Sequence, residues 1–262
     1  SDHDRLATTA GRNAQLSLHT GLRLPWGIVV DAATRRVATR NWIRRADQSQ
    51  GVVDGEQVTL PDLTLRGTMH PRALENVVTT IGWTARVALT RQRSAVPGSA
   101  AGTPGDIRTS RVLSYPLGAN VEFADQGRLR ASFNVSTTYR LDSLPGTIAD
   151  SKAREMNADV SRTFPLPLSW QMRSPLRTRF GWQQQSATTW LINDLVTGAR
   201  SRLADNGRRS ISLNADTDVA ENLTFSLQGA HITTFDNNLN RRFTQIVFST
   251  VLQIAFFAGE LR

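Results

Sequence analysis

The sequence alternates apolar and polar residues without a break from Arg128 to Leu141. The odd positions of this segment are Leu129, Ala131, Phe133, Val135, Thr137, Tyr139 and Leu141, and the even positions are Arg128, Arg130, Ser132, Asn134, Ser136, Thr138 and Arg140. Successive side chains of a β-strand point to opposite faces of its sheet, whereas the same residues on an α-helix would form no consistent apolar stripe. The segment is therefore predicted to be a long strand with one apolar and one polar face.

The same period of two recurs along the chain and predicts about eleven strands. The predicted strands cover residues 14–30, 36–44, 58–67, 79–93, 107–123, 128–141, 154–164, 168–192, 208–218, 222–234 and 241–258. Strands of soluble proteins usually have about five or six residues, whereas a transmembrane β-strand needs about ten. The fold class we predict is therefore all-β, an antiparallel transmembrane β-barrel of about 11–12 long strands.

This barrel, or the C-terminal part of a larger one, is expected to occupy residues 1–262, with 1–13 as a poorly defined N-terminal segment. A twelfth strand within 1–13 would make the count even, as in most bacterial barrels. Two alternatives remain open. One is a complete small outer-membrane barrel, either a porin or an enzyme. The other is a soluble all-β binding or structural domain.

The connections between the predicted strands alternate in length. Residues 31–35, 124–127, 165–167 and 219–221 are short connections, 68–78 is intermediate, and 45–57, 92–106, 142–153, 193–207 and 235–240 are longer. Bacterial outer-membrane barrels have short periplasmic turns and long external loops. We therefore expect the bacterial outer membrane as the location, with the C-terminus on the periplasmic side.

Large aromatic residues lie near both ends of the predicted strands. The candidates for two girdles at the membrane surfaces are Trp26, Trp42, Trp83, Tyr139, Trp170, Trp190 and Phe256. Arg111 does not fit this pattern, because it shares the parity of the lipid-facing residues and an Arg at the bilayer midplane costs about 2–4 kcal/mol. It must lie near the outer interface, face another protein element or mark a bulge.

Composition excludes several classes of function. The chain has no Cys, which excludes thiolate nucleophiles and Cys-ligated zinc. Its net charge of +9 is scattered over strands and loops, so it predicts no nucleic-acid partner. The hydrophobic fraction of 39% resembles that of a soluble protein, but a barrel exposes only every second residue to lipid.

No motif for catalysis, cofactor binding or metal binding is present. The four histidines, His3, His19, His70 and His231, have no ligand spacing. The Gly-rich segment 97–105 lacks the Lys-Ser/Thr of a phosphate-binding loop, and 236–240 lacks the Gly and Glu of a calcium loop. We expect no enzyme, cofactor or metal site. His231, near the outer end of a strand, is the residue to test if the barrel were an enzyme.

Basic residues lie on the polar side of several predicted strands. The set expected to face the lumen consists of Arg86, Arg128, Arg130 and Arg140. Such a lumen would select anions or line a protein-conducting channel. Alternatively, each Arg pairs with an Asp or Glu on a neighbouring strand.

Parts of residues 58–262 resemble the C-terminal part of the SprA (Sov) family, the large outer-membrane translocon of type IX secretion, which is linked to gliding motility. The similar segments are 60–66, with Gly67 where Trp is usual in the family, 200–207, 210–228, 240–245 and 248–257. The resemblance implies a protein-conducting pore without catalysis. Its partners would be outer-membrane lipid, secreted proteins, and plug or accessory proteins.

Overall fold

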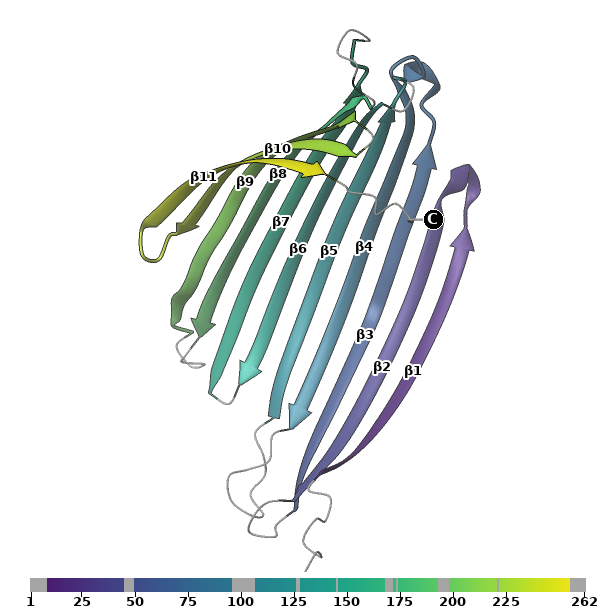
Figure 1. Cartoon of the computed structure of the whole chain (residues 1–262). Helices are drawn as coiled ribbons and strands as arrows, with labels where there is room; N and C mark the ends of the chain where they lie inside the picture. The colour runs from purple at the N-terminus through teal and green to yellow at the C-terminus, as the bar shows by residue number, and fades with distance from the viewer. Residues whose placement is uncertain are drawn as a thin grey trace, which may run out of the picture.

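The computed structural model describes residues 9–44, 50–95, 107–125, 128–144, 146–167, 172, 174–192, 198–220 and 222–254. These residues form one antiparallel sheet of eleven strands, in which every strand pairs with its neighbours in the sequence (Figure 1). The all-β antiparallel fold predicted from the alternation is confirmed. Helix is limited to two three-residue 3₁₀ turns in the described part of the chain.

The strands are long, and most of them have a short connection at one end or the other. Their bounds are β1 Thr9–Arg23, β2 Val29–Arg44, β3 Gln50–Met69, β4 Val78–Ala95, β5 Ile107–Phe123, β6 Leu129–Leu144, β7 Thr147–Phe164, β8 Leu176–Ile192, β9 Arg200–Ala220, β10 Leu223–Asp236 and β11 Arg241–Ile254.

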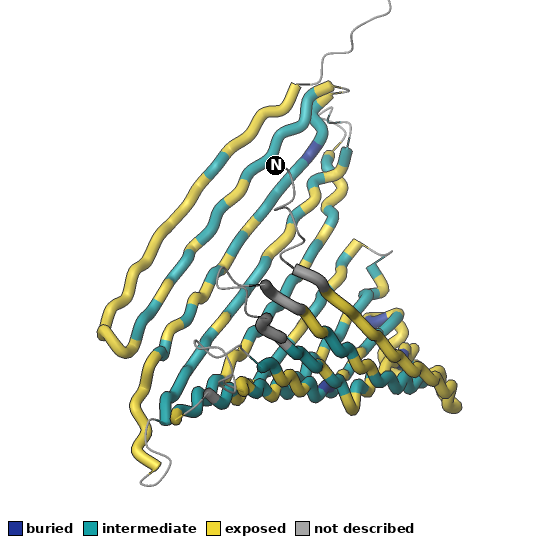
Figure 2. The backbone as a smooth tube through the Cα atoms, turned by 90° about the horizontal axis from the view of Figure 1, so that it is seen from below, coloured by how far each residue is buried: buried dark blue, intermediate teal, exposed yellow. Residues whose placement is uncertain are grey.

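The sheet bends along its width but does not close. Figure 1 shows β1 to β7 side by side and the opposite edge, formed by β10 and β11, curled. Figure 2 shows the resulting open trough. Among the described residues, β1 pairs only with β2 and β11 pairs only with β10. The described strands thus form an open antiparallel sheet, with β1 and β11 as its two edges.

The sheet has almost no buried core. Within the described part of the chain, Val78 and Ala88 are the buried apolar residues, and no large side chain is fully buried. Most positions are intermediate or exposed (Figure 2). The described residues also include no helix with the length and apolar character needed to cross a membrane.

The first hairpin differs from the prediction. Residues 14–30 were expected to form one strand, but the chain turns at Pro25–Gly27, where Trp26 has φ 65° and Gly27 has φ 74°. The predicted turn at 31–35 lies inside β2. Because β1 residues pair with β2 residues of the same parity, such as Leu22 with Val30, the apolar pattern continues through the turn and conceals it.

The predicted alternation of connection lengths is also wrong. The connections at one end of the sheet are 24–28, 70–77, 124–128, 165–175 and 221–222, and those at the other end are 45–49, 96–106, 145–146, 193–199 and 237–240. The two sets are of similar length. The predicted loops 142–153 and 193–207 lie largely in strands, and the predicted strand from 168 begins only at Leu176.

Within 1–13, where a twelfth strand was one possibility, residues 9–13 belong to β1, and residues 1–8 lie outside the described part.

Candidate functional site

The two faces of the sheet carry different side chains. Directly paired residues of neighbouring strands project from the same face, so the register assigns every strand position to a face. Leu113 on β5 pairs with Tyr139 on β6, and Val160 on β7 pairs with Phe180 on β8. We call the face of these four residues the apolar face and the opposite one the polar face.

A continuous apolar belt crosses all eleven strands on the apolar face. The belt consists of every second residue of 16–22, 30–32, 63–69, 81–89, 113–121, 129–135, 156–164, 176–182, 211–215, 225–227 and 246–254, starting with the first residue of each range. Its large side chains are open to solvent: Ile246 is 79% exposed and Phe248 is 70% exposed. The belt lies toward the end of the sheet that carries the 24–28 turn.

One charged residue belongs to the belt. Arg162 lies at the end of β7, where its Nη2 is 3.3 Å from an Asp125 carboxylate oxygen and its guanidinium carbon is 5.0 Å from the centre of the Phe164 ring. The charge is therefore paired at the edge of the belt.

A second zone of the apolar face lies beyond the belt, toward the opposite end of the strands, and is rich in cations. We call it the basic belt; its members are Arg12, Arg36, Arg40, Arg91, Arg93, Arg111, Lys152, Arg154, Arg200, Arg202, Arg209 and Arg242. Acidic residues on the same zone are fewer: Asp54, Glu56, Asp150 and Asp205. Arg111 belongs to this zone, just beyond Leu113, so it lies at the margin of the belt and at no bulge.

Some predicted girdle residues lie at the two margins of the apolar belt. Trp26 is in the turn at one end and is 89% exposed. At the other margin, the Tyr139 ring contacts Tyr115 edge-on at 6.3 Å between centroids, and Lys152 Nζ is 5.2 Å from the Tyr139 centroid. Farther from the belt, eight residues beyond its end on β8, Arg202 lies over the Trp190 ring at 5.0 Å. The Tyr139 and Trp190 rings are thus in contact with basic-belt cations.

The remaining girdle residues are less informative. Trp83 lies within the belt on β4, against Gly67 of β3. Trp42 is in β2, but its side chain lies outside the described set. Trp170 and Phe256 lie outside the described residues altogether.

Many charges of the polar face are held in ion pairs, most of them between neighbouring strands. Arg86 donates to Asp62 through Nε at 2.7 Å and Nη2 at 2.6 Å. Further pairs on this face join Arg66 to Asp31 at 3.2 Å, Arg130 to Glu122 at 3.5 Å, Arg140 to Asp142 at 2.7 Å, Arg179 to Asp159 at 3.0 Å and Arg177 to Asp216 at 3.9 Å. Cations and carboxylates on the polar face are therefore close to balanced.

The four arginines predicted to face a lumen have different environments. Arg86, Arg130 and Arg140 are on the polar face, and each is paired with a carboxylate. Arg128 precedes β6, and its backbone nitrogen donates to the Asp125 carbonyl in the turn. Arg86 and Arg130 follow the expected alternative of pairing with an acidic residue on a neighbouring strand, whereas the partner of Arg140 is Asp142 on the same strand.

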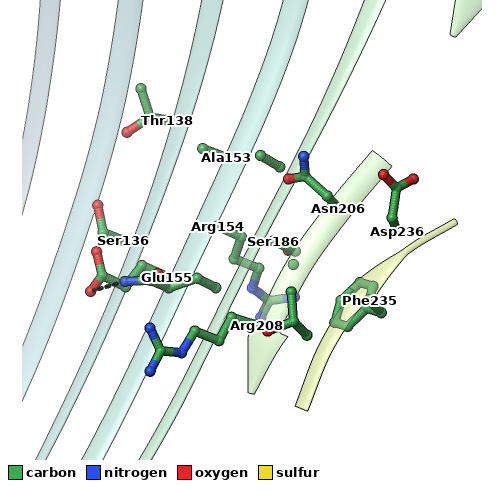
Figure 3. A pocket seen from close by; sticks show the side chains of 14 residues that line it. Ser136, Thr138, Ala153, Arg154, Glu155, Ser186, Asn206, Arg208, Phe235 and Asp236 are labelled. Atoms are coloured by element: carbon green, nitrogen blue, oxygen red, sulfur yellow. Dashed lines mark hydrogen bonds between the residues drawn. The ribbon is translucent and has the colours of Figure 1, made fainter. Parts of the chain in front are cut away.

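A cavity of about 600 Å³ lies on the polar face, where the sheet curls (Figure 3). Side chains from β6 to β10 line it, including Ser136, Glu155, Asn206, Arg208 and Asp236. Strands four places apart can contribute to one cavity only where the sheet curves around it, since adjacent strands are about 4.8 Å apart. The polar face is therefore the concave face in this region.

A carboxylate surrounded by amides lies at the edge of this cavity. Glu155 Oε1 accepts hydrogen bonds from Gln185 Nε2 at 3.2 Å, Gln183 Nε2 at 3.4 Å and Asn157 Nδ2 at 3.4 Å. Asn157 Oδ1 is buried and has no partner within the described part of the chain. This amide-rich surface offers both donors and acceptors to a polar chain, but it contains no nucleophile-base pair.

The chain shows no metal cluster among its described residues: no three His, Asp or Glu side chains gather there. His231 pairs with Ile211 and Ile246, so it is on the apolar face, away from the cavity. His70 Nδ1 is 2.9 Å from the Thr79 carbonyl oxygen. His3 and the whole Gly-rich segment 97–105 lie outside the described residues. Among the described residues, the cross-strand neighbours of His231 are thus two isoleucines, which cannot serve as catalytic partners.

A scan against protein-family models gives no match, and no curated protein matches the sequence.

Proposed function

We propose that the chain forms part of the wall of a transmembrane β-barrel in a bacterial outer membrane. The apolar belt faces lipid in this proposal, and the polar face lines the lumen. The observation that carries the proposal is the continuity of the belt over every strand of the sheet. The belt segments of β4, β5 and β11, residues 81–89, 113–121 and 246–254, match the roughly 9–11 residues with which a tilted strand crosses a bilayer.

The absence of a second layer supports a lipid-facing belt. A soluble β-sandwich covers the apolar face of one sheet with another sheet, about 10 Å away. Here the large apolar side chains of the described strands, such as Leu18 at 62% exposure and Leu252 at 57%, have no protein layer over them. Lipid is the solvent that would cover such a belt without a protein partner.

The free edges of β1 and β11 support a larger barrel. Unpaired strand edges are not tolerated in the hydrocarbon region of a membrane, because their backbone groups would remain without hydrogen bonds. The proposed wall therefore pairs at both edges with further strands. In this respect the sheet agrees better with an arc of a large barrel than with a complete small porin.

Within this wall, we propose a protein-conducting channel of the SprA type as the specific function. Two features support it beside the sequence resemblance. The polar face is lined with Ser, Thr, Asn and Gln around neutralised ion pairs, so it would accommodate chains of either charge. The 60–66 segment lies in β3, where Leu63 and Leu65 belong to the belt. Secreted proteins and plug or accessory proteins are the partners that this function implies.

Membrane extraction tests the barrel proposal. Membranes from cells that express the chain with its native flanking sequence would be washed with urea and with alkaline carbonate. Retention of the chain in the washed pellet, with release by detergent, is the expected result. Release of a monodisperse, detergent-free protein would overturn the proposal and favour the soluble all-β alternative.

A second experiment tests the channel. A secreted passenger protein would be trapped during export in membranes that retain the chain. Crosslinkers placed on the polar face would then report contact between the chain and the trapped passenger. Crosslinks from Ser136 and Gln185 positions to the passenger are expected, because both line the concave cavity. Crosslinking confined to positions on the apolar face would contradict a conducting lumen.

A further inference from the structure

The basic belt is an excess of positive charge on the face that also carries the apolar belt. Arg91 on β4 pairs directly with Arg111 on β5, and Arg12 on β1 pairs directly with Arg40 on β2. Like charges directly opposite each other on neighbouring strands are unfavourable. Asp54 neutralises Arg40, whereas the Arg91–Arg111 pair has no carboxylate partner among the described residues, so this pair indicates a surface that is completed by an external anion.

The ion pairs of the region leave part of this charge uncompensated. Arg36 and Arg40 are paired with Glu56 at 2.7 Å and Asp54 at 2.8 Å. For Arg12, Arg91, Arg93 and Arg111, the described residues provide no salt bridge. All four side chains are exposed.

A shallow groove of about 540 Å³ lies on this face between β1 and β4. Arginines 12, 36, 40 and 93 form its walls together with the carboxylates of Asp54 and Glu56, which pair with Arg40 and Arg36. The small side chains of Ala14, Ala38 and Ala95 line the groove between them. Guanidinium groups bind phosphate in a bidentate manner, and the alanines leave space for a headgroup next to the sheet.

The position of the Arg91–Arg111 pair relative to the apolar belt identifies the class of ligand. Directly below Arg111 and Arg91 on the same face are Leu113 and Leu89, which belong to the belt. A ligand with phosphates above and acyl chains below would satisfy both zones at once. Aromatic rings at the same margin, such as Tyr139 with Lys152, are typical of a membrane interface.

We propose that the basic belt binds the phosphate groups of an anionic glycolipid in the outer leaflet of the membrane, with the groove and the Arg91–Arg111 pair as its strongest contacts. This inference rests on the proposed barrel function, since the acyl chains of the lipid must lie against the apolar belt. It also assigns the orientation of the sheet, placing the 45–49, 96–106 and 145–146 connections outside the cell.

Lipid binding in micelles tests the proposal. The chain, extracted in a zwitterionic detergent, would be titrated with bisphosphorylated lipid A and with the same lipid after removal of its phosphates. Bound lipid would be counted by native mass spectrometry. Tighter binding of the phosphorylated lipid is the expected result for the unmodified chain.

Paired variants locate the site. Arg91→Gln with Arg111→Gln is expected to weaken binding of the phosphorylated lipid by about twentyfold to thirtyfold, on the scale of surface arginines near anionic lipid. The matched control, Arg23→Gln with Arg108→Gln, removes the same charge from the polar face of β1 and β5 and is expected to leave binding unchanged. Loss of binding to a similar extent in both variants would overturn the site.

The outcomes also separate this inference from the barrel proposal. Equal affinity for the two lipids, in a chain that is retained in washed membranes, would overturn lipid recognition and leave the barrel intact. A co-purifying protein bound at the basic belt in place of lipid would likewise overturn lipid recognition. A chain that is released from membranes without detergent would overturn both.

Discussion

Arg91 and Arg111 lie directly opposite each other on β4 and β5, at the margin of the apolar belt. Each is followed, toward the belt, by a leucine that also pairs with its counterpart, Leu89 with Leu113. Repulsion between the two guanidinium groups lowers the stability of the sheet at this position. Removing the repulsion should therefore raise the free energy of unfolding measurably.

We predict that Arg111→Glu stabilises the sheet in zwitterionic detergent. The substitution converts a like-charge pair into an opposite-charge pair, which contributes about 0.2–1 kcal/mol across strands. The free energy of unfolding in urea would be measured with and without the change. A lower free energy of unfolding in the Glu variant would show that the two guanidinium groups do not repel each other in the sheet.

The Arg86–Asp62 pair is expected to stabilise the polar face. Its two hydrogen bonds, at 2.7 and 2.6 Å, form a bidentate contact between β4 and β3. A double-mutant cycle with Arg86→Gln and Asp62→Asn should give a coupling free energy of about 0.5–1 kcal/mol, because both groups remain partly exposed.

The Arg177–Asp216 pair, at 3.9 Å, provides the matched control for that cycle. Its longer separation predicts a coupling free energy within about 0.3 kcal/mol of zero. Coupling of equal size in both pairs would contradict the assignment of the Arg86 contact as a specific one.

Gly67 is predicted to be required for the position of Trp83. A Cβ atom at Gly67 would lie 2.7 Å from the Trp83 ring, so the ring would have to move. Gly67→Ala should therefore lower the free energy of unfolding by about 1–3 kcal/mol. Gly82→Ala is the control on β4, because a Cβ there meets nothing within 4 Å, and it should change stability little.

A charge in the apolar belt is predicted to be more damaging than the same charge on the polar face. Phe133→Arg places a cation in the belt on β6, which costs about 2–4 kcal/mol at the bilayer midplane. Asn134→Arg, one residue further, points to the polar face and should be tolerated. The fraction of folded, membrane-retained protein would be compared for the two variants, and equal loss in both would contradict the two-face assignment.

The sequence predicts local strand character well because alternation is a property of neighbouring residues. The β5 segment Ile107–Phe123 has the predicted bounds, and β6 begins within one residue of its prediction. The turn at Trp26 was missed because pairing of equal-parity residues continues the apolar pattern across it. A positive φ at a tryptophan gives no signal in the sequence.

Side-chain contacts between neighbouring strands could not be predicted from the sequence. Whether Arg86 meets Asp62 depends on the β3–β4 register, which shifts between Thr59 and Asp62. The same holds for the cavity, which needs the curvature of β6 to β10, and for the Arg91–Arg111 pair. Residue types alone left two interpretations of these arginines open, a cationic lumen and neutralisation by acidic residues of neighbouring strands.

The central claim is that one face of the sheet meets lipid and the other meets water. The absence of cysteine makes a direct test simple, because each introduced cysteine is the only one in the chain. Single cysteines would be placed at successive positions of β6 from Leu129 to Val135, and intact membranes would be treated with a water-soluble maleimide. We predict labelling at Arg130, Ser132 and Asn134 positions and protection at Leu129, Ala131, Phe133 and Val135 positions. Uniform labelling at all seven would contradict a membrane-embedded sheet.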